Sequence, residues 1–284
     1  MASTGLIGLG LIGGAIARRL VETGDAPLVF DLRAEAVDSA VGAGAIAARS
    51  IRELAQRCDI ILVCVQNDDQ CVAAVGGAGG VLEGARPGTC VAVLSTILPS
   101  TIVTLAERAA GLGIHLVDTP VAGRGMFSVA DGTMSVLMGD DGELVARLEP
   151  TLLRFAARVV PAGRLGSGAA LKLAHNVIVY AGFAAMLEAL ELARAAGVRD
   201  GLVEDVAQTS GALSMLSLFF YMHHPGESHS ADEEAALRVA AALLDKDLSD
   251  AVALAETHGV AAPIARLLSH SGAEIFLAEH RRTR

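Results

Sequence analysis

Residues 7–20 read IGLGLIGGAIARRL, and this stretch decides the fold class. The apolar run 4–9 predicts a short strand, while the apolar residues of 15–20 recur at a helical period. Gly8, Gly10 and Gly13 stand where the two meet, with the spacing G-x-G-x-x-G. A strand, a glycine-rich turn and a helix in this order are typical of the first unit of a dinucleotide-binding domain.

Each glycine of this turn has a distinct physical task if a dinucleotide binds. The first permits the tight turn, the second lets backbone N–H groups approach a pyrophosphate, and the third lets the helix pack closely on the strand. The alternative is a packing turn in an enzyme that binds no nucleotide. We predict that the whole loop contacts the coenzyme, namely Gly8, Leu9, Gly10, Leu11, Ile12 and Gly13.

The coenzyme prediction extends to the end of the next expected strand, 27–32. Asp31 follows Gly8 by 23 positions, close to the spacing of about 20 at which a carboxylate accepts the ribose hydroxyls of an adenosine. This carboxylate favours NAD, because a 2′-phosphate would meet its negative charge. Arg33 leaves NADP open, because its guanidinium could bind that phosphate. A solvated strand end is the alternative interpretation of Asp31.

Strands and helices alternate through the first part of the chain. After the first two strands we expect strands at 45–47, 60–65, 89–94 and 115–118, and helices at 34–42, 50–56, 69–75 and 99–111. This alternation predicts an α/β fold, a Rossmann-like, doubly wound parallel sheet with helices on both faces.

The character of the chain changes after about residue 161, where glycine becomes rarer and β-branched runs end. Residues 169–196 read as one helix, roughly 40 Å long at about 1.5 Å per residue, and further helices are expected at 202–213, 231–257 and 263–279. We therefore expect two domains joined by the long helix. A dinucleotide-binding domain occupies 1–163, and an all-helical domain for substrate binding and dimerisation occupies 164–284.

Composition disfavours several kinds of partner. With 32 acidic against 22 basic residues the formal net charge is −10, which disfavours nucleic acid and anionic lipid. Apolar residues make up 52% of the chain, but the long apolar stretches are interrupted, so we predict no membrane segment and a cytoplasmic protein. The four cysteines have no CxxC spacing and are expected to be buried thiols in a reducing compartment, with no metal site.

The stretch GSGAALKLAHN (166–176) sets a lysine among glycine, alanine and leucine. On a helix, Lys172 and Asn176 are one turn apart and share a face. An isolated lysine on an apolar helix usually extends its amine to water, which is the alternative here. If the amine is desolvated, its pKa falls, and it can exchange a proton with an alcohol while hydride passes to the coenzyme.

Five phrases in register resemble the β-hydroxyacid dehydrogenases, the family of 3-hydroxyisobutyrate dehydrogenase and tartronate semialdehyde reductase. They are IGLGLIGGAIARRL (7–20), LSTILPST (94–101), DTPVAGRGMFSVADGTMSVLMGD (118–140), GSGAALKLAHN (166–176) and LLDKDL (243–248). The resemblance implies an NAD(P)-dependent oxidoreductase that interconverts a β-hydroxy acid or related alcohol with its aldehyde or ketone. It also implies a homodimer or homotetramer whose active site lies in the cleft between the two domains.

The resemblance also implies roles for individual residues. Lys172 matches the catalytic lysine, and Asn176 matches its partner, which holds the substrate's hydroxyl or carboxylate. Thr96 matches a threonine beside the nicotinamide, and Lys246 matches a lysine that reaches the coenzyme from the helical domain. The positions of a loop that contacts the coenzyme are filled by Val65 and Gln66.

The phrase at 118–124 departs from the family pattern DxPVSGG. Ala122 stands where a serine would bond to the substrate carboxylate, a loss of about 1.5–3 kcal/mol of recognition, and Arg124 replaces a glycine. Either Arg124 restores the contact by pairing with an anion, or the site takes a larger, less anionic compound. The candidate substrate contacts are Ser95, whose hydroxyl could equally serve the backbone, and Ala122, Gly123, Arg124 and Asn176.

Two rival functions remain open. Imine reduction by an NADPH enzyme is known in the wider group, but those proteins commonly carry aspartate or tyrosine at the position of Lys172. A catalytically silent nucleotide-sensing module is disfavoured by the presence of both Lys172 and Asn176. The aromatic stretch LFFYMHH (218–224) is expected to serve core packing or a dimer contact, or else to line a substrate pocket.

Overall fold

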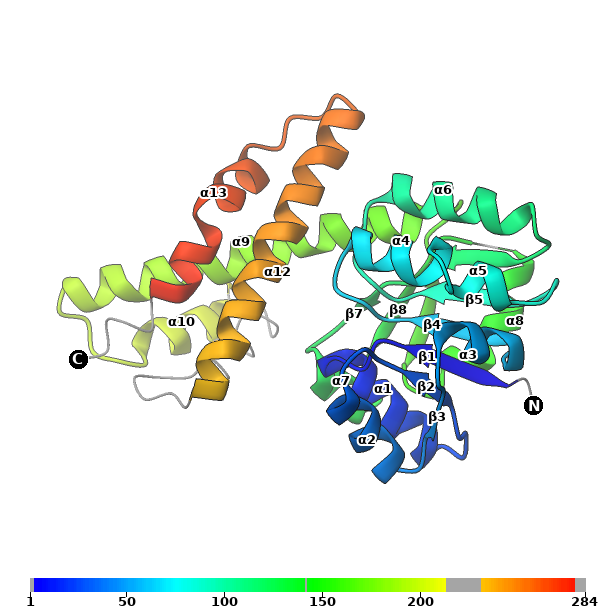
Figure 1. Cartoon of the computed structure of the whole chain (residues 1–284). Coiled ribbons are helices and arrows are strands. Elements are labelled where there is room, and N and C mark those ends of the chain that lie inside the picture. Colours follow the sequence, from blue (N-terminus) through cyan, green and yellow to red (C-terminus); the bar gives the residue numbers. More distant parts are fainter. Residues whose placement is uncertain (1–2, 141, 213–230, 279–284) are drawn as a thin grey trace. The chain divides into compact units, whose positions relative to one another are not determined.

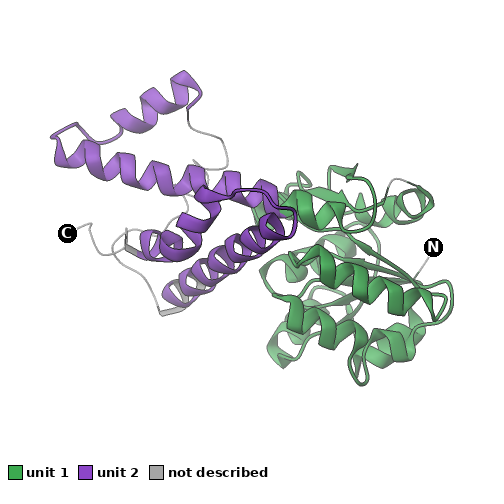
Figure 2. Cartoon of the chain, turned by 90° about the horizontal axis from the view of Figure 1, so that it is seen from above, with its two compact units in different colours: residues 1–172 green, residues 173–284 purple. Residues whose placement is uncertain are grey.

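The computed structural model describes residues 3–140, 142–212 and 231–278 of the chain (Figure 1). The chain divides into two compact units, residues 1–172 and 173–284 (Figure 2). Each unit has its own hydrophobic core. The division falls inside a long helix, whereas the domain boundary predicted from the sequence precedes that helix.

A six-stranded parallel sheet forms the centre of the first unit, in the order β3-β2-β1-β4-β5-β6. The chain builds outward from β1 to β3 and returns to the other side of β1 with β4, so the strand order reverses between β1 and β4. In doubly wound sheets this reversal opens a crevice at the carboxyl edge, where a dinucleotide binds. The strands are β1 Thr4–Ile7, β2 Leu28–Phe30, β3 Ile46–Ala47, β4 Ile60–Val63, β5 Cys90–Val93 and β6 His115–Asp118.

Apolar side chains on both faces of the strands explain why helices cover both sides of the sheet. One face carries Leu6 and Leu62 into a core with helices α1, α2 and α8. The opposite face carries Ile7 and Ile61 into a core with helices α3 to α6. The helices are α1 Leu11–Glu22, α2 Ala34–Gly42, α3 Ile51–Arg57, α4 Asp68–Gly76, α5 Val81–Gly84, α6 Pro99–Ala110 and α8 Glu143–Leu152.

A smaller, three-stranded sheet follows the main one and is absent from the elements predicted above. In it β8 (Ser135–Met138) pairs antiparallel with β7 (Val121–Ala122) and parallel with β9 (Arg158–Pro161). The short helix α7 (Met126–Ala130) connects β7 to β8. Strand β7 lies between Pro120 and Gly123, and β9 ends in Pro161, so the sequence of both segments resembles a turn more than a strand.

The second unit is helical throughout its described residues. It takes most of α9 (Ser167–Ala195), then α10 (Leu202–Ser210), α12 (Ala231–Thr257) and α13 (Pro263–Ala278). Leucines of α9, α12 and α13 form its core. The prediction of a parallel α/β domain followed by a long helix and an all-helical region is confirmed. The aromatic stretch 218–224 lies outside the described residues.

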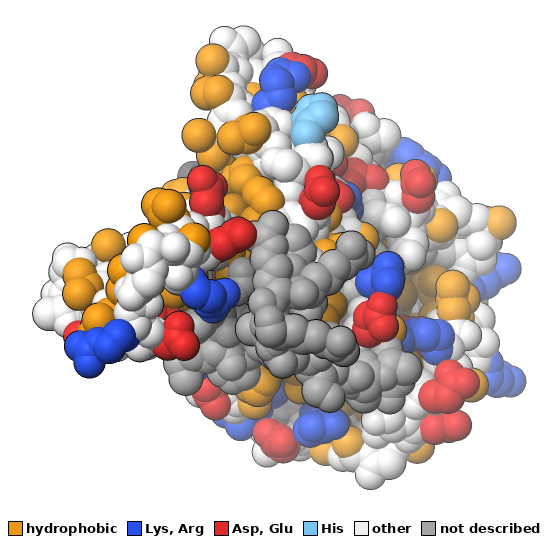
Figure 3. Space-filling view, turned by 90° about the vertical axis from the view of Figure 1, so that its left-hand side faces the viewer, with side chains coloured by type: hydrophobic (Ala, Val, Ile, Leu, Met, Phe, Trp, Pro, Cys, Tyr) orange, Lys and Arg blue, Asp and Glu red, His pale blue; other side chains and the backbone are white. Residues whose placement is uncertain are grey.

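Some hydrophobic side chains of the helical unit lie on its surface, interspersed with charged ones (Figure 3). Ile178 and Leu192 of α9 are 74% and 72% exposed, and Leu267 of α13 is 63% exposed. Exposed single apolar residues are common in proteins, but several large ones on one helical unit are typical of a contact surface.

Helix α9 is long and apolar enough to cross a membrane by length and composition alone. Buried helices of soluble proteins pass the same test, so this is weak evidence. Asn176 of α9 is buried and bonds to a side chain of α12, as is typical of a helix inside a protein core. That the chain has no membrane segment stays a prediction.

Candidate active site

The glycine turn after β1 is shaped by close backbone contacts. Gly8 has a φ of +90°, a conformation that residues with a Cβ rarely adopt, and its N–H donates to the Phe30 carbonyl at 2.9 Å. A Cβ at Gly13 would lie 3.0 Å from the carbonyl carbon of Gly8 and closer still to its oxygen. The first and third glycines therefore let the turn close and let α1 pack directly on it.

The second glycine of the motif leaves room for a ligand. A Cβ at Gly10 would meet no atom of the described residues within 4 Å. Gly10 is the N-cap of α1, where no described side chain caps the helix and no acidic residue occupies the first turn. Helix N-termini of this kind present N–H groups and a partial positive charge. The turn therefore fits the pyrophosphate of NAD or NADP.

Asp31 lies just beyond β2, beside this turn. Its Oδ2 accepts the Leu9 N–H at 2.6 Å, and its Oδ1 accepts the backbone N–H of Arg33 at 2.9 Å and the Nε–H at 3.1 Å. Burial raises the pKa of Asp31, but the hydrogen bonds from Arg33 and Leu9 outweigh it and hold the pKa below its usual value. Asp31 is thus an ionised carboxylate next to the glycine turn, and its nearest cation is Arg33, whose side chain is 60% exposed.

Further coenzyme candidates lie in the loops at the carboxyl ends of β4 and β5. Val65 and Gln66 follow β4, and Thr96 follows β5. The buried hydroxyl of Ser95 accepts the Val65 N–H at 2.9 Å, which ties the two loops together. Because β1, β4 and β5 are neighbours in the sheet, these loops and the glycine turn share one edge. Ser95, predicted as a substrate contact, has a backbone partner in the structure.

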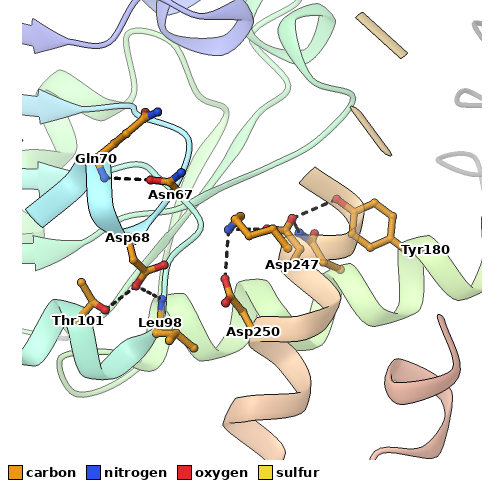
Figure 4. Close-up of polar contacts among 10 residues, drawn as sticks. Asn67, Asp68, Gln70, Leu98, Thr101, Tyr180, Asp247 and Asp250 are labelled. Carbon is orange, nitrogen blue, oxygen red and sulfur yellow. Dashed lines mark hydrogen bonds and ion pairs between the residues drawn. The ribbon is translucent and has the colours of Figure 1, made fainter. Parts of the chain in front are cut away.

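A second tie joins the same two loops (Figure 4). Asp68, in the first turn of α4, accepts the Leu98 N–H at 3.1 Å and the Thr101 hydroxyl at 2.5 Å. Asn67 caps α4 by accepting the Gln70 N–H at 2.9 Å. Neither Asp68 nor Asn67 is among the residues predicted from the sequence. Their signal was an N-cap residue followed by two aspartates directly after a buried strand.

A buried aspartate joins β6 to the start of α9. Asp118 is 1% exposed, and it accepts the Gly166 N–H at 2.9 Å on Oδ1 and the Ala169 N–H at 2.7 Å on Oδ2. Burial raises the pKa of Asp118, and the backbone hydrogen bonds offset only part of this rise. Lys172 follows Ala169 by less than one helical turn. Asp118 therefore fixes the start of the lysine helix at the carboxyl edge of the sheet.

Ala122 and Arg124 belong to β7 and the turn into α7. The backbone N–H of Arg124 donates to the Ser128 hydroxyl at 2.7 Å, and its guanidinium pairs with Asp131 at 2.7 Å. The two charged side chains are 39% and 54% exposed, so solvent screens their attraction. Arg124 has a carboxylate partner in its own loop, and its pairing with a substrate anion stays a prediction.

A buried polar cluster in the helical unit has Asp247 at its centre (Figure 4). Asn176 Nδ2 donates to Asp247 Oδ2 at 2.6 Å, and the Tyr180 hydroxyl donates to the same oxygen at 3.1 Å. Lys246 Nζ pairs with Asp247 Oδ1 at 2.9 Å and with Asp250 Oδ2 at 3.2 Å. Sequence reasoning missed Asp247, although the phrase LLDKDL contains it, because the partner on α9 is 71 residues away.

Charges in this cluster shift two pKa values. Burial and the Asp247 carboxylate raise the pKa of Tyr180 well above its usual value, so the phenol stays a hydrogen-bond donor. Burial lowers the pKa of Lys246, but the two neighbouring carboxylates outweigh it, and the net pKa is raised. Lys246 is therefore a firmly held cation.

Lys172 and Lys246 are the only lysines of the whole sequence. Lys172 lies one turn before Asn176 on α9, as predicted. His175 Nδ1 is 3.4 Å from Asn176 Oδ1, which is longer than an ordinary hydrogen bond. Within residues 3–140, 142–212 and 231–278, no group of three or more His, Cys, Asp or Glu side chains is arranged to hold a metal ion.

Comparison with known proteins agrees with this geometry. Residues 3–163 match the NAD binding domain of 6-phosphogluconate dehydrogenase, and residues 166–279 match a family described as NAD-binding of NADP-dependent 3-hydroxyisobutyrate dehydrogenase. The chain belongs to the β-hydroxyacid dehydrogenase family. This dehydrogenase is therefore an oxidoreductase that uses NAD or NADP, and the coenzyme fits the glycine turn described above.

Individual relatives of the dehydrogenase cover nearly its whole length. An uncharacterized oxidoreductase of Mycobacterium tuberculosis is 36% identical over 265 residues, 93% of this chain and 89% of the relative. The 3-hydroxyisobutyrate dehydrogenase of Pseudomonas aeruginosa is 30% identical over 274 residues, 94% of this chain and 90% of the relative. The structure of Mycobacterium tuberculosis 3-hydroxyisobutyrate dehydrogenase with L-serine has a TM-score of 0.80 at 25% identity, covering 99% of this chain and 95% of that one.

Proposed function

We propose that this dehydrogenase interconverts a small β-hydroxy acid with its aldehyde or ketone, with Lys172 as the general acid and base and NAD as the preferred coenzyme. The observation that carries the proposal is the Asp118 anchor, which sets the Lys172 helix at the sheet edge that holds the glycine turn. A lysine on a helix that begins at the coenzyme-binding edge of the sheet could move the proton of a hydride-transfer reaction.

Each group has one task in the proposed reaction. When bound, the coenzyme accepts the hydride that leaves the alcohol carbon. The neutral amine of Lys172 takes the hydroxyl proton, and the ammonium returns it to the carbonyl oxygen in the reverse direction. Asn176, one turn further along the same helix face, orients the substrate oxygen. A general acid–base group of this kind supplies roughly 10²- to 10⁴-fold of the rate.

The substrate class is supported by the names of the relatives. They include dehydrogenases of 3-hydroxyisobutyrate, L-threonate and L-serine, and each of these compounds carries a hydroxyl group and a carboxylate. Ala122 supplies no hydroxyl to a substrate carboxylate, which weakens its recognition by about 1.5–3 kcal/mol if nothing replaces the bond. We therefore propose a hydroxy acid substrate that is recognised partly through other groups, with Arg124 as a candidate.

The preference for NAD is supported by Asp31. Its carboxylate is ionised, lies beside the glycine turn and would repel a 2′-phosphate. Arg33 opposes this preference, because its guanidinium covers the carboxylate and is exposed to solvent. We expect kcat/KM to be higher with NAD than with NADP, and the preference to reverse or vanish in Asp31→Ala. A wild-type enzyme that favours NADP would contradict this assignment.

The proposed function is tested with a panel of hydroxy acids, aryl alcohols and imines, with each coenzyme, by absorbance at 340 nm. Lys172→Met should lower kcat at least about 100-fold and leave coenzyme binding intact. Lys246→Met, the other lysine changed in the same way, should raise the KM for the coenzyme and should lower kcat less than Lys172→Met does. Near-normal turnover in Lys172→Met would refute the mechanism. If the absorbance at 340 nm changed with imines alone, imine reduction would be favoured. If it changed with no compound of the panel, a nucleotide sensor would be favoured.

We further infer that the enzyme is a cytoplasmic homodimer or homotetramer. The exposed apolar residues of the helical unit, including Ile178 and Leu192, support an oligomer. The four cysteines are free thiols, which supports a reducing compartment. Light scattering after gel filtration tests the first inference, and a mass near 29.0 kDa, that of one chain, would contradict it.

A further inference from the structure

Asp247 meets Asn176 with a group that can only accept hydrogen bonds. An ionised carboxylate has no donor, whereas the amide of asparagine has a donor end and an acceptor end of almost the same shape. At 2.6 Å from Asp247 Oδ2, only the NH₂ end of the amide can face the carboxylate, because the reversed amide would bring two oxygens together. The short distance is typical of a hydrogen bond to a charged group.

The rest of the cluster holds this carboxylate in place. The Tyr180 hydroxyl donates to the same oxygen from one turn further along α9, and Lys246 pairs with the other oxygen. Asp250 holds Lys246 from the following turn of α12. A carboxylate that is 5% exposed needs such partners, because an unpaired buried charge is strongly destabilising. Lys246, itself held by Asp250, therefore fixes Asp247 independently of both Asn176 and Tyr180.

We propose that Asp247 is a positioning residue for the reaction, which it serves by fixing the amide of Asn176 so that its Oδ1 is kept as a hydrogen-bond acceptor. This inference rests on the proposed function. A fixed acceptor suits the groups that carry the moving proton, the substrate hydroxyl and the ammonium of Lys172 one turn away. If the amide could reverse, one of its two orientations would point the NH₂ group at the substrate hydroxyl and the ammonium. All of these groups are donors, so no hydrogen bond would form.

A purely structural role for Asp247 is the competing explanation, because the same bonds also join α9 to α12. Tyr180 separates the two explanations. Its hydroxyl bonds to the same oxygen from the same helix, so Tyr180→Phe weakens the junction and leaves the bond to Asn176 in place. If Asp247 serves only to join the two helices, Tyr180→Phe and Asp247→Asn should therefore lower kcat by similar factors.

The experiment is a double-mutant cycle measured as kcat, using Asp247→Asn, Asn176→Ala and the double variant, with Tyr180→Phe as the matched control. An amide at position 247 can face Asn176 with either end, so the orientation is lost while size is kept. We expect Asp247→Asn to lower kcat at least about 10-fold in the wild-type background. In the Asn176→Ala background the same change should alter kcat less than about 2-fold. Tyr180→Phe should lower the melting temperature while keeping kcat within about 3-fold of wild type.

Four results would overturn the inference: wild-type kcat in Asp247→Asn, wild-type kcat in Asn176→Ala, additive losses in the double variant, or an equal loss in Tyr180→Phe. If Asp247→Asn does not fold, Asp247→Ser takes its place in the cycle, since the smaller side chain leaves room for water beside Tyr180 and Lys246. Lys172→Met keeps the two proposals apart. If Lys172→Met loses turnover while Asp247→Asn keeps the wild-type kcat, only the positioning role is refuted. If Lys172→Met itself keeps the wild-type kcat, the proposed function is refuted.

Discussion

The anchoring of α9 by Asp118 predicts that Asp118→Asn damages stability and catalysis together. The carboxylate accepts backbone N–H groups on both oxygens, among them those of Gly166 at 2.9 Å and Ala169 at 2.7 Å. An asparagine keeps one acceptor oxygen and sets its NH₂ group against the remaining N–H. One hydrogen bond to a charged group is lost, at about 1.5–3 kcal/mol.

Burial sets the size of the net effect. Burial raises the pKa of Asp118, which means that removing the ionised carboxylate from water costs free energy. The neutral amide of the Asp118→Asn variant avoids this cost. The expected loss of unfolding free energy is therefore about 2 kcal/mol, in the middle of the range for a lost charged hydrogen bond. At about 2–4 °C per kcal/mol for a unit of this size, the melting temperature should fall by roughly 4–8 °C.

Catalysis should suffer because Lys172 follows the anchored turn. A displacement of about 1 Å at a catalytic group can cost roughly 100-fold in rate, so we expect kcat to fall at least about 10-fold. Asp59→Asn is the matched control, since Asp59 precedes β4 at the opposite edge of the sheet and is 48% exposed. A normal kcat in Asp118→Asn, despite a lower melting temperature, would refute the claim that this contact positions Lys172.

Two further predictions concern the glycine turn and the buried thiols. Gly13→Ala should weaken NAD binding at least about 10-fold, because its Cβ presses on Gly8. Gly14→Ala is the control and should bind NAD normally, since its Cβ meets its nearest atom at an ordinary 3.5 Å. Equal affinities of the two variants for NAD in calorimetry would contradict this prediction. Burial raises the pKa of Cys58 to about 11 and the pKa of Cys71 to about 12, so a disulfide reagent at pH 8 should label these thiols only after unfolding. These thiols ionise more easily in the unfolded chain, so their contribution to the free energy of unfolding is complete below about pH 9 and is lost as the pH rises through 11 to 12. Rapid labelling of the folded protein would refute the burial of the two thiols.

The main sheet could be predicted from the sequence because its signals are local. The run before Gly8 and the apolar stretch at 60–65 are bounded by turn residues, and alternating strands and helices leave few topologies open. The long helix could be predicted for the same reason, since few helix breakers interrupt it. The second sheet could not, because β7 lies between Pro120 and Gly123 and β9 ends in Pro161, and these residues are signals of turns.

The site could be predicted where a motif is continuous and was missed where the partners are distant. Gly8, Asp31 and Lys172 stand in recognisable local patterns. Asp118 and Asp247 owe their roles to partners 48 to 51 and 71 residues away, and only the folded chain brings these groups together. Arg33 shows a third case, because the sequence places it near the coenzyme but does not reveal that it pairs with Asp31.

The central claim is that the reaction needs an amine at position 172, and restoring that amine by chemistry tests it most directly. Lys172→Cys should lose at least about 100-fold in kcat. Treatment with 2-bromoethylamine then rebuilds a side chain of nearly lysine length on the introduced thiol, while the native cysteines, with their raised pKa values, react slowly. The account predicts that kcat recovers at least about 10-fold once mass spectrometry shows one added aminoethyl group per chain. Full turnover before treatment, or no recovery after it, would contradict the account.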